Sequence, residues 1–152
     1  MAEYLNLDIL TPDGRVDLRL TEGGKPGREK GPIEVEGVEL PAALGEMGVK
    51  PRHIPLLTPV VPGVVRFRFE GSDQRMAVGA GFLEISETGV VTLLTERALR
   101  SWEVEVDAAR KQLDEVTKEL EQHAKAAIDD AKVLKLKARR DWLEAQLRAA
   151  QA

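Results

Sequence analysis

One histidine in a proline-containing stretch is the residue that most directly suggests chemistry. With Glu46, Lys50 and Arg52, His53 belongs to the stretch Gly45-Glu46-Met47-Gly48-Val49-Lys50-Pro51-Arg52-His53-Ile54-Pro55-Leu56-Leu57-Thr58. An imidazole near a carboxylate can act as a general base or bind a metal ion. However, no second histidine, cysteine or acidic cluster lies at ligand spacing, and a Gly-x-Ser-x-Gly nucleophile signature is missing. We therefore expect a structural role for His53, with no catalytic or metal-binding residue.

The same stretch also constrains the backbone. It holds two glycines three residues apart and two prolines four residues apart, a combination that disfavours both a helix and the middle of a sheet. The sequence therefore predicts a rigid, extended bend, which Ile54, Leu56 and Leu57 anchor to the rest of the protein.

Composition limits the classes of protein to be considered. The 152 residues suffice for one domain, or for a compact domain with an appendage, and 43% of them are hydrophobic. The net charge of −4 argues against a nucleic-acid-binding protein, and the lack of cysteine excludes disulfides and thiol catalysis. With no long apolar run and no signal-peptide pattern at Met1, we expect a soluble chain on the cytosolic side that reaches a membrane only through partners.

Proline and glycine divide the chain into two parts. All 8 prolines lie between Pro12 and Pro62, and all 13 glycines lie between Gly14 and Gly89. Because both residues punctuate strands and weaken helix interiors, the division predicts an all-β front and an all-helical back. We place the boundary near residues 95–101, which gives a domain over 1–97 and another over 98–152.

The front part has the alternating pattern of short strands. Proline and glycine favour a turn at residues 11–14, and the apolar-free segment 21–31 is predicted to be a surface loop. The expected strands cover residues 4–10, 15–20, 33–36, 38–40, 64–69, 74–78, 81–86 and 90–95. This succession of short strands and turns is typical of a β-sandwich or barrel rather than of a parallel sheet.

The back part has the period of two helices. Ser101 is the expected N-cap of the first, and Asp129 or Asp130 that of the second. The first helix carries a narrow apolar seam, formed by Trp102, Val106, Ala109, Leu113, Val116 and Leu120. On the second, the apolar residues of one face are Val133, Leu136, Leu143, Leu147 and Ala150.

Charge indicates how these helices pair. Residues 103–121 hold seven acids and three bases, whereas residues 132–148 hold six bases and two acids. Opposite net charges favour an antiparallel hairpin with complementary rims, although exposed pairs add little stability. Because two helices alone bury little area, the hairpin must pack on the β-domain or on a partner, and its detachment should cost little.

The residues of the proline-containing stretch resemble a known family. Residues 45–58 are similar to the G-E-[LIM]-G-[IV]-x-P-G-H-x-P-L-L-T segment of the epsilon subunit of F-type ATP synthases. Further matches are the 62–66, 81–85 and 90–94 segments, and the order of sandwich and hairpin extends the resemblance to the whole chain. The chain departs from the family at Arg52, where glycine is usual, at Lys50, at Ala80 and in the 21–31 loop.

The resemblance implies a non-catalytic subunit of the central stalk. In this family the sandwich binds the gamma subunit and rests on the ring of c subunits, so that proton flow is coupled to ATP synthesis. It implies that Glu46, Lys50, Arg52 and His53 face this rotor interface, at the cytoplasmic face of the cell inner membrane. The helical hairpin can fold on the sandwich or extend towards the catalytic alpha and beta subunits and inhibit ATP hydrolysis.

The resemblance also implies ATP as a regulatory ligand. Some bacterial members bind it through an [IL]-D-x-x-R-A motif at the start of the hairpin, and residues 106–111 match that motif in Asp107 and Arg110. Arg139 and Arg140 could add guanidinium groups for the phosphates. An aspartate and an arginine three residues apart on a helix are, equally, typical of an ordinary surface pair.

Two other classes of function stay open at this point. One is a free-standing β-sandwich that binds a ligand or carbohydrate, for which the six aromatic residues of the chain offer little binding surface. The other is a hydrolase that uses His53 with a carboxylate.

Overall fold

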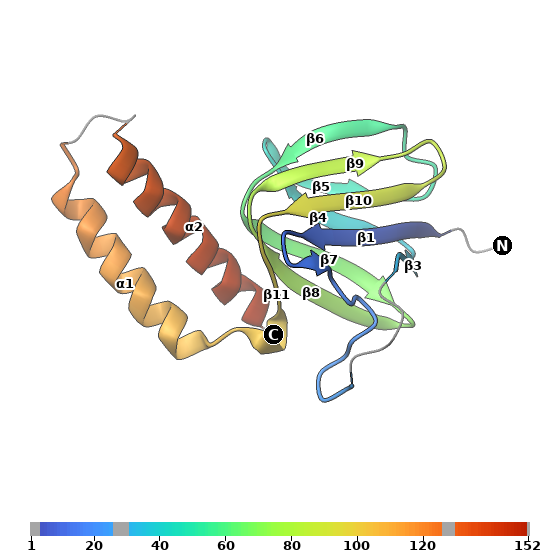
Figure 1. Cartoon of the computed structure of the whole chain (residues 1–152), viewed down its shortest axis with the longest axis horizontal. Coiled ribbons are helices and arrows are strands. Elements are labelled where there is room, and N and C mark those ends of the chain that lie inside the picture. Colours follow the sequence, from blue (N-terminus) through green and yellow to red (C-terminus); the bar gives the residue numbers. More distant parts are fainter. Residues whose placement is uncertain (1–3, 26–30, 126–129, 152) are drawn as a thin grey trace.

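A computed structural model describes residues 4–25, 31–125 and 130–151 and shows a β-domain followed by two helices (Figure 1). The strands are β1 (Leu5–Thr11), β2 (Gly14–Arg15), β3 (Ile33–Val35), β4 (Val38–Ala42), β5 (Gly45–Val49), β6 (Leu56–Val60), β7 (Gly63–Phe69), β8 (Ser72–Val78), β9 (Gly81–Ile85), β10 (Val90–Thr95) and β11 (Ala98–Arg100). The predicted strands are therefore confirmed, with small shifts at their ends, except for the one over 15–20.

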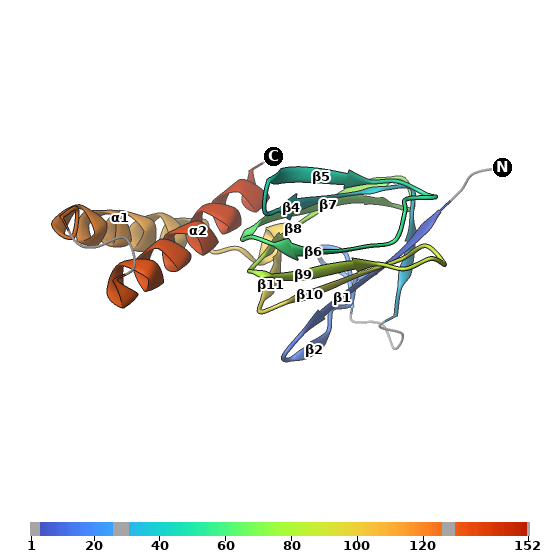
Figure 2. The ribbon, with the colours of Figure 1, turned by 90° about the horizontal axis from the view of Figure 1, so that it is seen from above.

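The strands form one sheet that folds over on itself. Their order is β11-β8-β7-β4-β6-β9-β10-β1-β2, with β3 on β1 and β5 on β4. Among the described strands, β1 and β10 are the parallel pair, and the other pairs are antiparallel. Figure 2 shows β4, β5, β7 and β8 in one layer and β1, β6, β9 and β10 in the other. The predicted N-terminal sandwich is confirmed.

Alternation along the strands builds the core between the layers. On β7, Val65 and Phe67 are buried in the core, whereas Arg66 and Arg68 lie on the outer face. The turn to β8 has positive φ angles at Glu70 and Gly71, 50° and 78°, as a two-residue hairpin turn requires.

The predicted strand over 15–20 is wrong. β2 ends at Arg15, and the chain then turns while Leu18 is buried in the core. The carbonyl oxygen of Asp17 accepts hydrogen bonds from Arg100 Nη2 at 2.6 Å and from the Leu20 N–H at 3.3 Å. Its carboxylate accepts from the Arg19 N–H at 3.2 Å. Two of these bonds are local and the one from Arg100 is long-range, and together they stabilise a turn that the alternation of side chains alone does not reveal.

The proline-containing stretch is only partly the predicted bend. Its two ends are the strands β5 and β6, and the bend itself is confined to the residues between them. Arg52 there has a φ of 68°, which explains why glycine would suit this position. The expected anchoring is also wrong for two residues, because Ile54 is 73% exposed and Leu57 is 69% exposed. Leu56 is the apolar residue that packs on the core.

The first helix begins later than predicted. Ser101 does not cap it, because a 3-10 turn, η1 (Ser101–Glu103), intervenes before α1 (Val106–Gln122). This turn is closed by Arg100, whose N–H and Nη1 both donate to Glu103 Oε1 at 2.9 Å. Trp102 consequently lies outside the helix seam and lines a small cavity beside Leu18.

The second helix, α2 (Ala131–Ala150), begins where the sequence predicts. Asp130 Oδ1 accepts hydrogen bonds from the N–H groups of Lys132, at 2.9 Å, and Val133, at 3.3 Å. Asp130 is therefore the N-cap, while Asp129, the other predicted cap, and residues 26–30 of the predicted loop lie outside the described residues. The described loop residues 21–25 are exposed, as predicted.

The helices pack as an antiparallel hairpin. The predicted seam is confirmed from Ala109 to Leu120, and it packs against Leu136, Leu143 and Leu147 of α2. In the described part of the chain no ion pair joins α1 to α2, so apolar packing holds them together. The fold class, an all-β sandwich followed by a helical hairpin, is confirmed.

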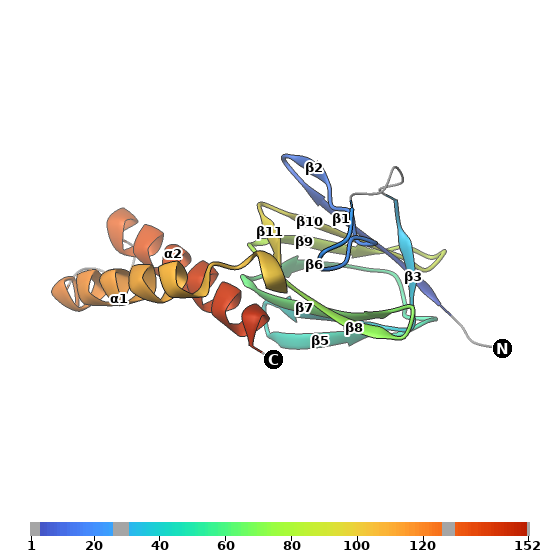
Figure 3. The ribbon, with the colours of Figure 1, turned by 90° about the horizontal axis from the view of Figure 1, so that it is seen from below.

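A second face of α2 rests on the sandwich, which is one of the two packing arrangements that the sequence left open. Trp142, Ala145 and Ala149 are buried against Val64 of β7 and Ala77 of β8. The Arg97 guanidinium carbon lies 4.7 Å from the ring centre of Trp142, a cation–π contact. Figure 3 shows α2 ending beside β7 and β8 while α1 lies farther from the sheet.

Candidate functional site

An apolar patch lies on the outer face of the layer formed by β6, β9 and β10. We define this apolar patch as Leu57, Pro59, Phe82 and Leu94. Leu57, Phe82 and Leu94 are 69%, 54% and 51% exposed. Pro59 is exposed and stands directly opposite Phe82, which in turn stands opposite Leu94. Since directly opposed residues point to the same face, three neighbouring strands present one continuous apolar surface.

The strands position this patch through their two-residue period. Leu56, Leu83 and Leu93 point into the sandwich core, so the residue beside each in the chain must point outward. The outer face is thus apolar because the strands carry adjacent apolar pairs instead of alternating with polar residues. Sequence reasoning missed this patch, and the adjacent pairs were the signal that could have revealed it.

A polar rim borders the apolar patch. Glu84 of β9 stands opposite Leu57 on one side and Thr92 of β10 on the other. A contiguous exposed apolar surface with a polar rim is typical of a protein-binding site.

The bend that follows β5 carries three of the four predicted interface residues. The exposed Lys50 and Arg52 and the half-buried His53 lie within four residues of each other in this bend. His53 makes local contacts, because its N–H donates to the Lys50 carbonyl at 3.1 Å and its Nδ1 lies 2.8 Å from the Ile54 carbonyl oxygen. The predicted structural role of His53 agrees with these contacts.

Glu46, the fourth predicted interface residue, is not part of this bend. It lies near the start of β5, whereas the other three follow the end of that strand. Its Oε1 accepts from Arg66 Nη1 at 3.0 Å, in an ion pair on the outer face of the sheet.

The predicted nucleotide-binding residues are only partly brought together. Arg139 lines a cavity of about 430 Å³ between the hairpin and the sandwich, together with Arg97 and Lys135. Asp107 and Arg110 of α1 do not line this cavity, and Arg140 forms an ion pair with its neighbour Asp141 at 3.2 Å.

The described residues offer neither a metal-binding cluster nor a membrane-spanning helix. No group of three or more histidine, cysteine or acidic side chains there is arranged to hold a metal ion. In the same part of the chain, no helix is long and apolar enough to cross a membrane.

Proteins of similar sequence are epsilon chains of ATP synthases, and the matching family model is that of a β-sandwich domain. Residues 29–101 match the family model of the ATP synthase delta/epsilon chain β-sandwich domain. The ATP synthase epsilon chain of Halalkalibacterium halodurans is 34% identical, over 82% of this chain and 83% of the relative. That of Nitratidesulfovibrio vulgaris is also 34% identical, over 87% of each chain.

Solved structures show the same fold at lower sequence identity. A chain in the mitochondrial ATP synthase of Euglena gracilis matches with a TM-score of 0.72 and 22% identity, over 97% of this chain and 81% of its own length. A chain in the central stalk and c-ring of the Tetrahymena thermophila mitochondrial ATP synthase matches with a TM-score of 0.62 and 11% identity, over 98% of both chains.

Proposed function

The chain belongs to the family of ATP synthase epsilon chains, and from this premise we propose that it is a non-catalytic rotor subunit of the central stalk in an F-type ATP synthase. In this role it binds other stalk subunits and turns with them, coupling proton translocation to ATP synthesis. Its place is then peripheral, at the cytoplasmic face of the cell inner membrane, where partners hold it.

The apolar patch is the observation that carries this proposal. Leu57, Phe82 and Leu94 expose more than half of their surface to water although the protein has a well-formed core. Covering them with a partner would remove apolar area from water and stabilise a complex. We assign the patch to the gamma subunit, the stalk partner with which an epsilon chain would rotate.

The bend after β5 is proposed to face the ring of c subunits. Lys50 and Arg52 are exposed there and can meet acidic loops, while the contacts of His53 hold the bend in shape. Glu46 lies at the other end of β5, so we place it at the edge of the same rotor interface. With this role the domain over 1–97 is the stalk-binding part of the chain.

The C-terminal part over 98–152, in which the helical hairpin follows β11 and η1, is proposed to regulate the enzyme. Among its described residues, it is α2 that packs on the sandwich, through the face around Trp142 and Ala145. Two arrangements that differ by a few kcal/mol suffice for a switch. Detached from the sandwich, the hairpin could reach the catalytic alpha and beta subunits and inhibit ATP hydrolysis.

ATP is the proposed regulatory ligand of the hairpin. The candidate residues for ATP are Asp107, Arg110, Arg139 and Arg140. Arg139 has the surroundings best suited to phosphate groups, because Arg97 and Lys135 line the same cavity. Calorimetric titration with ATP at millimolar concentration should give heat that the Arg139→Gln variant abolishes. Absence of heat with the unaltered chain would remove ATP from the proposal and leave stalk binding untouched.

The experiment that tests the proposed function is binding to the gamma subunit from the same organism. We expect a one-to-one complex with the full chain. Phe82→Glu should weaken it about thirtyfold or more, because a carboxylate would have to be buried in the apolar interface. The control is Leu134→Glu, which places the same charge at a leucine of α2 that is 50% exposed. A gamma subunit that binds neither variant nor the unaltered chain would disprove the proposal.

A further inference from the structure

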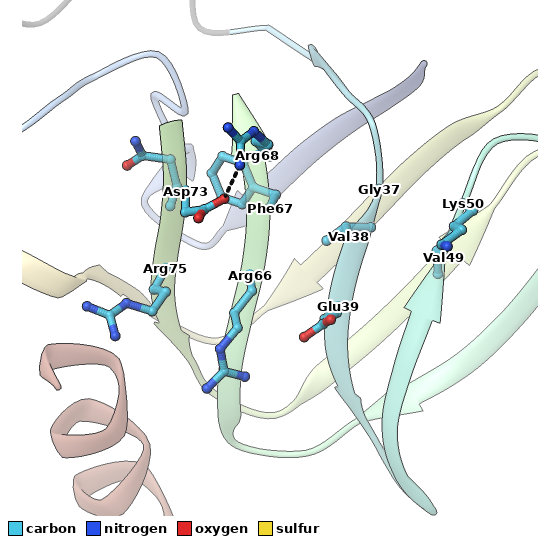
Figure 4. Close-up of a pocket in the computed structure, with 11 residues that line it drawn as sticks. Gly37, Val38, Glu39, Val49, Lys50, Arg66, Phe67, Arg68, Asp73 and Arg75 are labelled. Atoms are coloured by element: carbon cyan, nitrogen blue, oxygen red, sulfur yellow. Dashed lines mark hydrogen bonds and ion pairs between the residues drawn. The ribbon is translucent and has the colours of Figure 1, made fainter. Parts of the chain in front are cut away.

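A basic groove lies on the other layer of the sandwich. Its volume is about 580 Å³, and strands β4, β7 and β8 with the end of β5 contribute its walls. We define the basic groove by its charged lining: Lys50, Arg66, Arg68, Arg75, Glu39 and Asp73. Figure 4 shows Arg66 and Arg75 extending from neighbouring strands to the same side of the sheet. The groove and the apolar patch therefore belong to different layers and need not share a ligand.

The charge in this groove opposes that of the whole chain. Four basic side chains line it and two acidic ones, whereas the chain has a net charge of −4. Excess positive charge in a concave site attracts anions more strongly than the same charges spread over a surface.

Two arginines of the groove stand directly opposite each other on neighbouring strands. Arg66 of β7 stands directly opposite Arg75 of β8. Like charges at directly opposed positions destabilise a sheet, so this placement has a cost for the isolated chain. Glu46 offsets the charge of Arg66, through a contact of 3.0 Å, and Asp73 that of Arg68, at 3.3 Å.

Arg75 differs from Arg66 and Arg68, the other two arginines of the groove. It is half-buried, and within the described residues its guanidinium makes no hydrogen bond or ion pair. A guanidinium presents five N–H donors in a planar fork that fits the oxygens of a phosphate group. Among the described residues, Arg75 thus offers a fork without an acceptor, and it stands beside Arg66, whose Nη1 donates to Glu46.

We propose that the basic groove is a binding site for a phosphate-bearing anion, held mainly by Arg75 and Arg66. The groove volume lies within the range of small-molecule sites, about 300 to 1,000 Å³. Glu39 stands directly opposite Arg66 and Asp73 directly opposite Arg68, and these carboxylates would repel an extended acidic peptide more than a compact phosphate group at Arg75.

The groove would recognise the phosphate and not an attached base. Phe67 is the aromatic residue in its lining, and only 6% of Phe67 is exposed. No aromatic face in the described lining is therefore open for stacking a base. The groups that the groove can recognise are therefore phosphoryl oxygens, which a free phosphate compound or a lipid headgroup would supply.

The test is calorimetric titration of the full chain with sodium pyrophosphate. We expect one site, and we expect Arg75→Gln to weaken binding about tenfold or more, because it removes charge-assisted hydrogen bonds. Arg75→Lys, which keeps the charge without the fork, should give a smaller loss. The matched control is Lys118→Gln, which removes one positive charge from the exposed face of α1 and should leave the affinity unchanged.

A second variant separates the groove from the cavity beside the hairpin. If Arg139→Gln abolishes pyrophosphate binding while Arg75→Gln does not, the anion binds beside the hairpin and the proposal is overturned. Titration without heat overturns it as well. Amide NMR shifts should gather around Arg66, Arg75 and Lys50 in the unaltered chain, and shifts confined to other strands would contradict the assignment.

Vesicles distinguish the two sources of phosphate. Flotation with phosphatidylglycerol vesicles that is lost in Arg75→Gln would indicate a lipid headgroup, and pyrophosphate binding without flotation would indicate a free anion. Either result supports the site. Binding of a poly-glutamate peptide in place of pyrophosphate would show that the groove serves an acidic protein segment, contrary to the proposal.

Discussion

Gly81 of β9 lies in close contact with the backbone of β10. A Cβ atom built at this position would overlap the carbonyl oxygen of Leu94, and it would lie 2.9 Å from the Cα of Thr95. Because both are backbone atoms, they cannot rotate away as a flexible side chain would. The close pairing of β9 with β10 at the apolar patch, where Leu94 stands opposite Phe82, therefore depends on the glycine beside Phe82.

We predict that Gly81→Ala lowers the free energy of unfolding by about 1–3 kcal/mol, since the two strands must move apart to admit a methyl group. Chemical denaturation followed by circular dichroism measures this change. Gly48→Ala is the matched control, because Gly48 also lies in a strand and a Cβ there meets no atom within 4 Å. Its stability should stay within about 0.5 kcal/mol of the unaltered chain. Equal losses in both variants would contradict the close approach.

At the scale of elements, α2 is the link between hairpin and sandwich. One of its faces packs on α1 through Leu136, Leu143 and Leu147, and the other rests on β7 and β8 through Trp142 and two alanines. On the sandwich side α2 contributes one large side chain and two alanines, which add little area. Trp142 is therefore the largest side chain that α2 buries against the sandwich.

We predict that Trp142→Ala loosens the hairpin without unfolding the sandwich. Truncation of a buried tryptophan costs about 3 kcal/mol or more, and here the cation–π contact with Arg97 is lost as well. Hydrogen exchange should accelerate in α1 and α2 while β1 and β9 keep their protection. Leu134→Ala, at a half-exposed position of the same helix, should change neither. Uniformly faster exchange throughout the chain would mean that hairpin and sandwich unfold as one unit.

At the scale of the whole molecule, the junction between the two parts decides how the hairpin can be removed. β11 pairs with β8, and Arg100 donates to the Asp17 carbonyl at 2.6 Å. A chain that ends at Thr95 would lose these contacts, so a cut after Glu105 is the cleaner way to delete the hairpin.

We predict that a chain ending at Glu105 still binds the gamma subunit, because the apolar patch is intact. It should raise ATP hydrolysis by the catalytic head complex relative to the full chain, since the proposed inhibitory element is gone. Steady-state hydrolysis with each chain at saturating concentration measures the effect. Equal rates with both chains would show that the hairpin is not inhibitory, and would leave the stalk role of the sandwich intact.

Local residue patterns were sufficient to predict most of the elements. Gly71 lies in the turn between β7 and β8, and Gly89 likewise lies in the turn between β9 and β10. Asp130 defines the start of α2 through its own side chain, within three residues. The family resemblance likewise rests on a contiguous stretch. Each of these features is determined by neighbours in the chain, which a sequence displays directly.

The candidate sites were predicted less completely. The residues of the bend after β5 were recognised, whereas Glu46 proved to lie at the other end of the strand and Ile54 proved to be exposed. The apolar patch was missed, because whether an apolar residue faces core or water depends on which strands lie above and below it.

The sequence by itself determined the two-part architecture, the family and the periods of strands and helices, because these follow from side-chain spacing along the chain. Only the tertiary structure decided which faces remain open. After Arg15 the chain forms a turn instead of a strand, and there the Asp17 carbonyl accepts a long-range hydrogen bond from Arg100. Pairing of β7 with β8 places Arg66 opposite Arg75. The tertiary structure also leaves the Phe82 side chain exposed to solvent. Such outcomes depend on contacts between residues distant in the chain, which local pattern cannot specify.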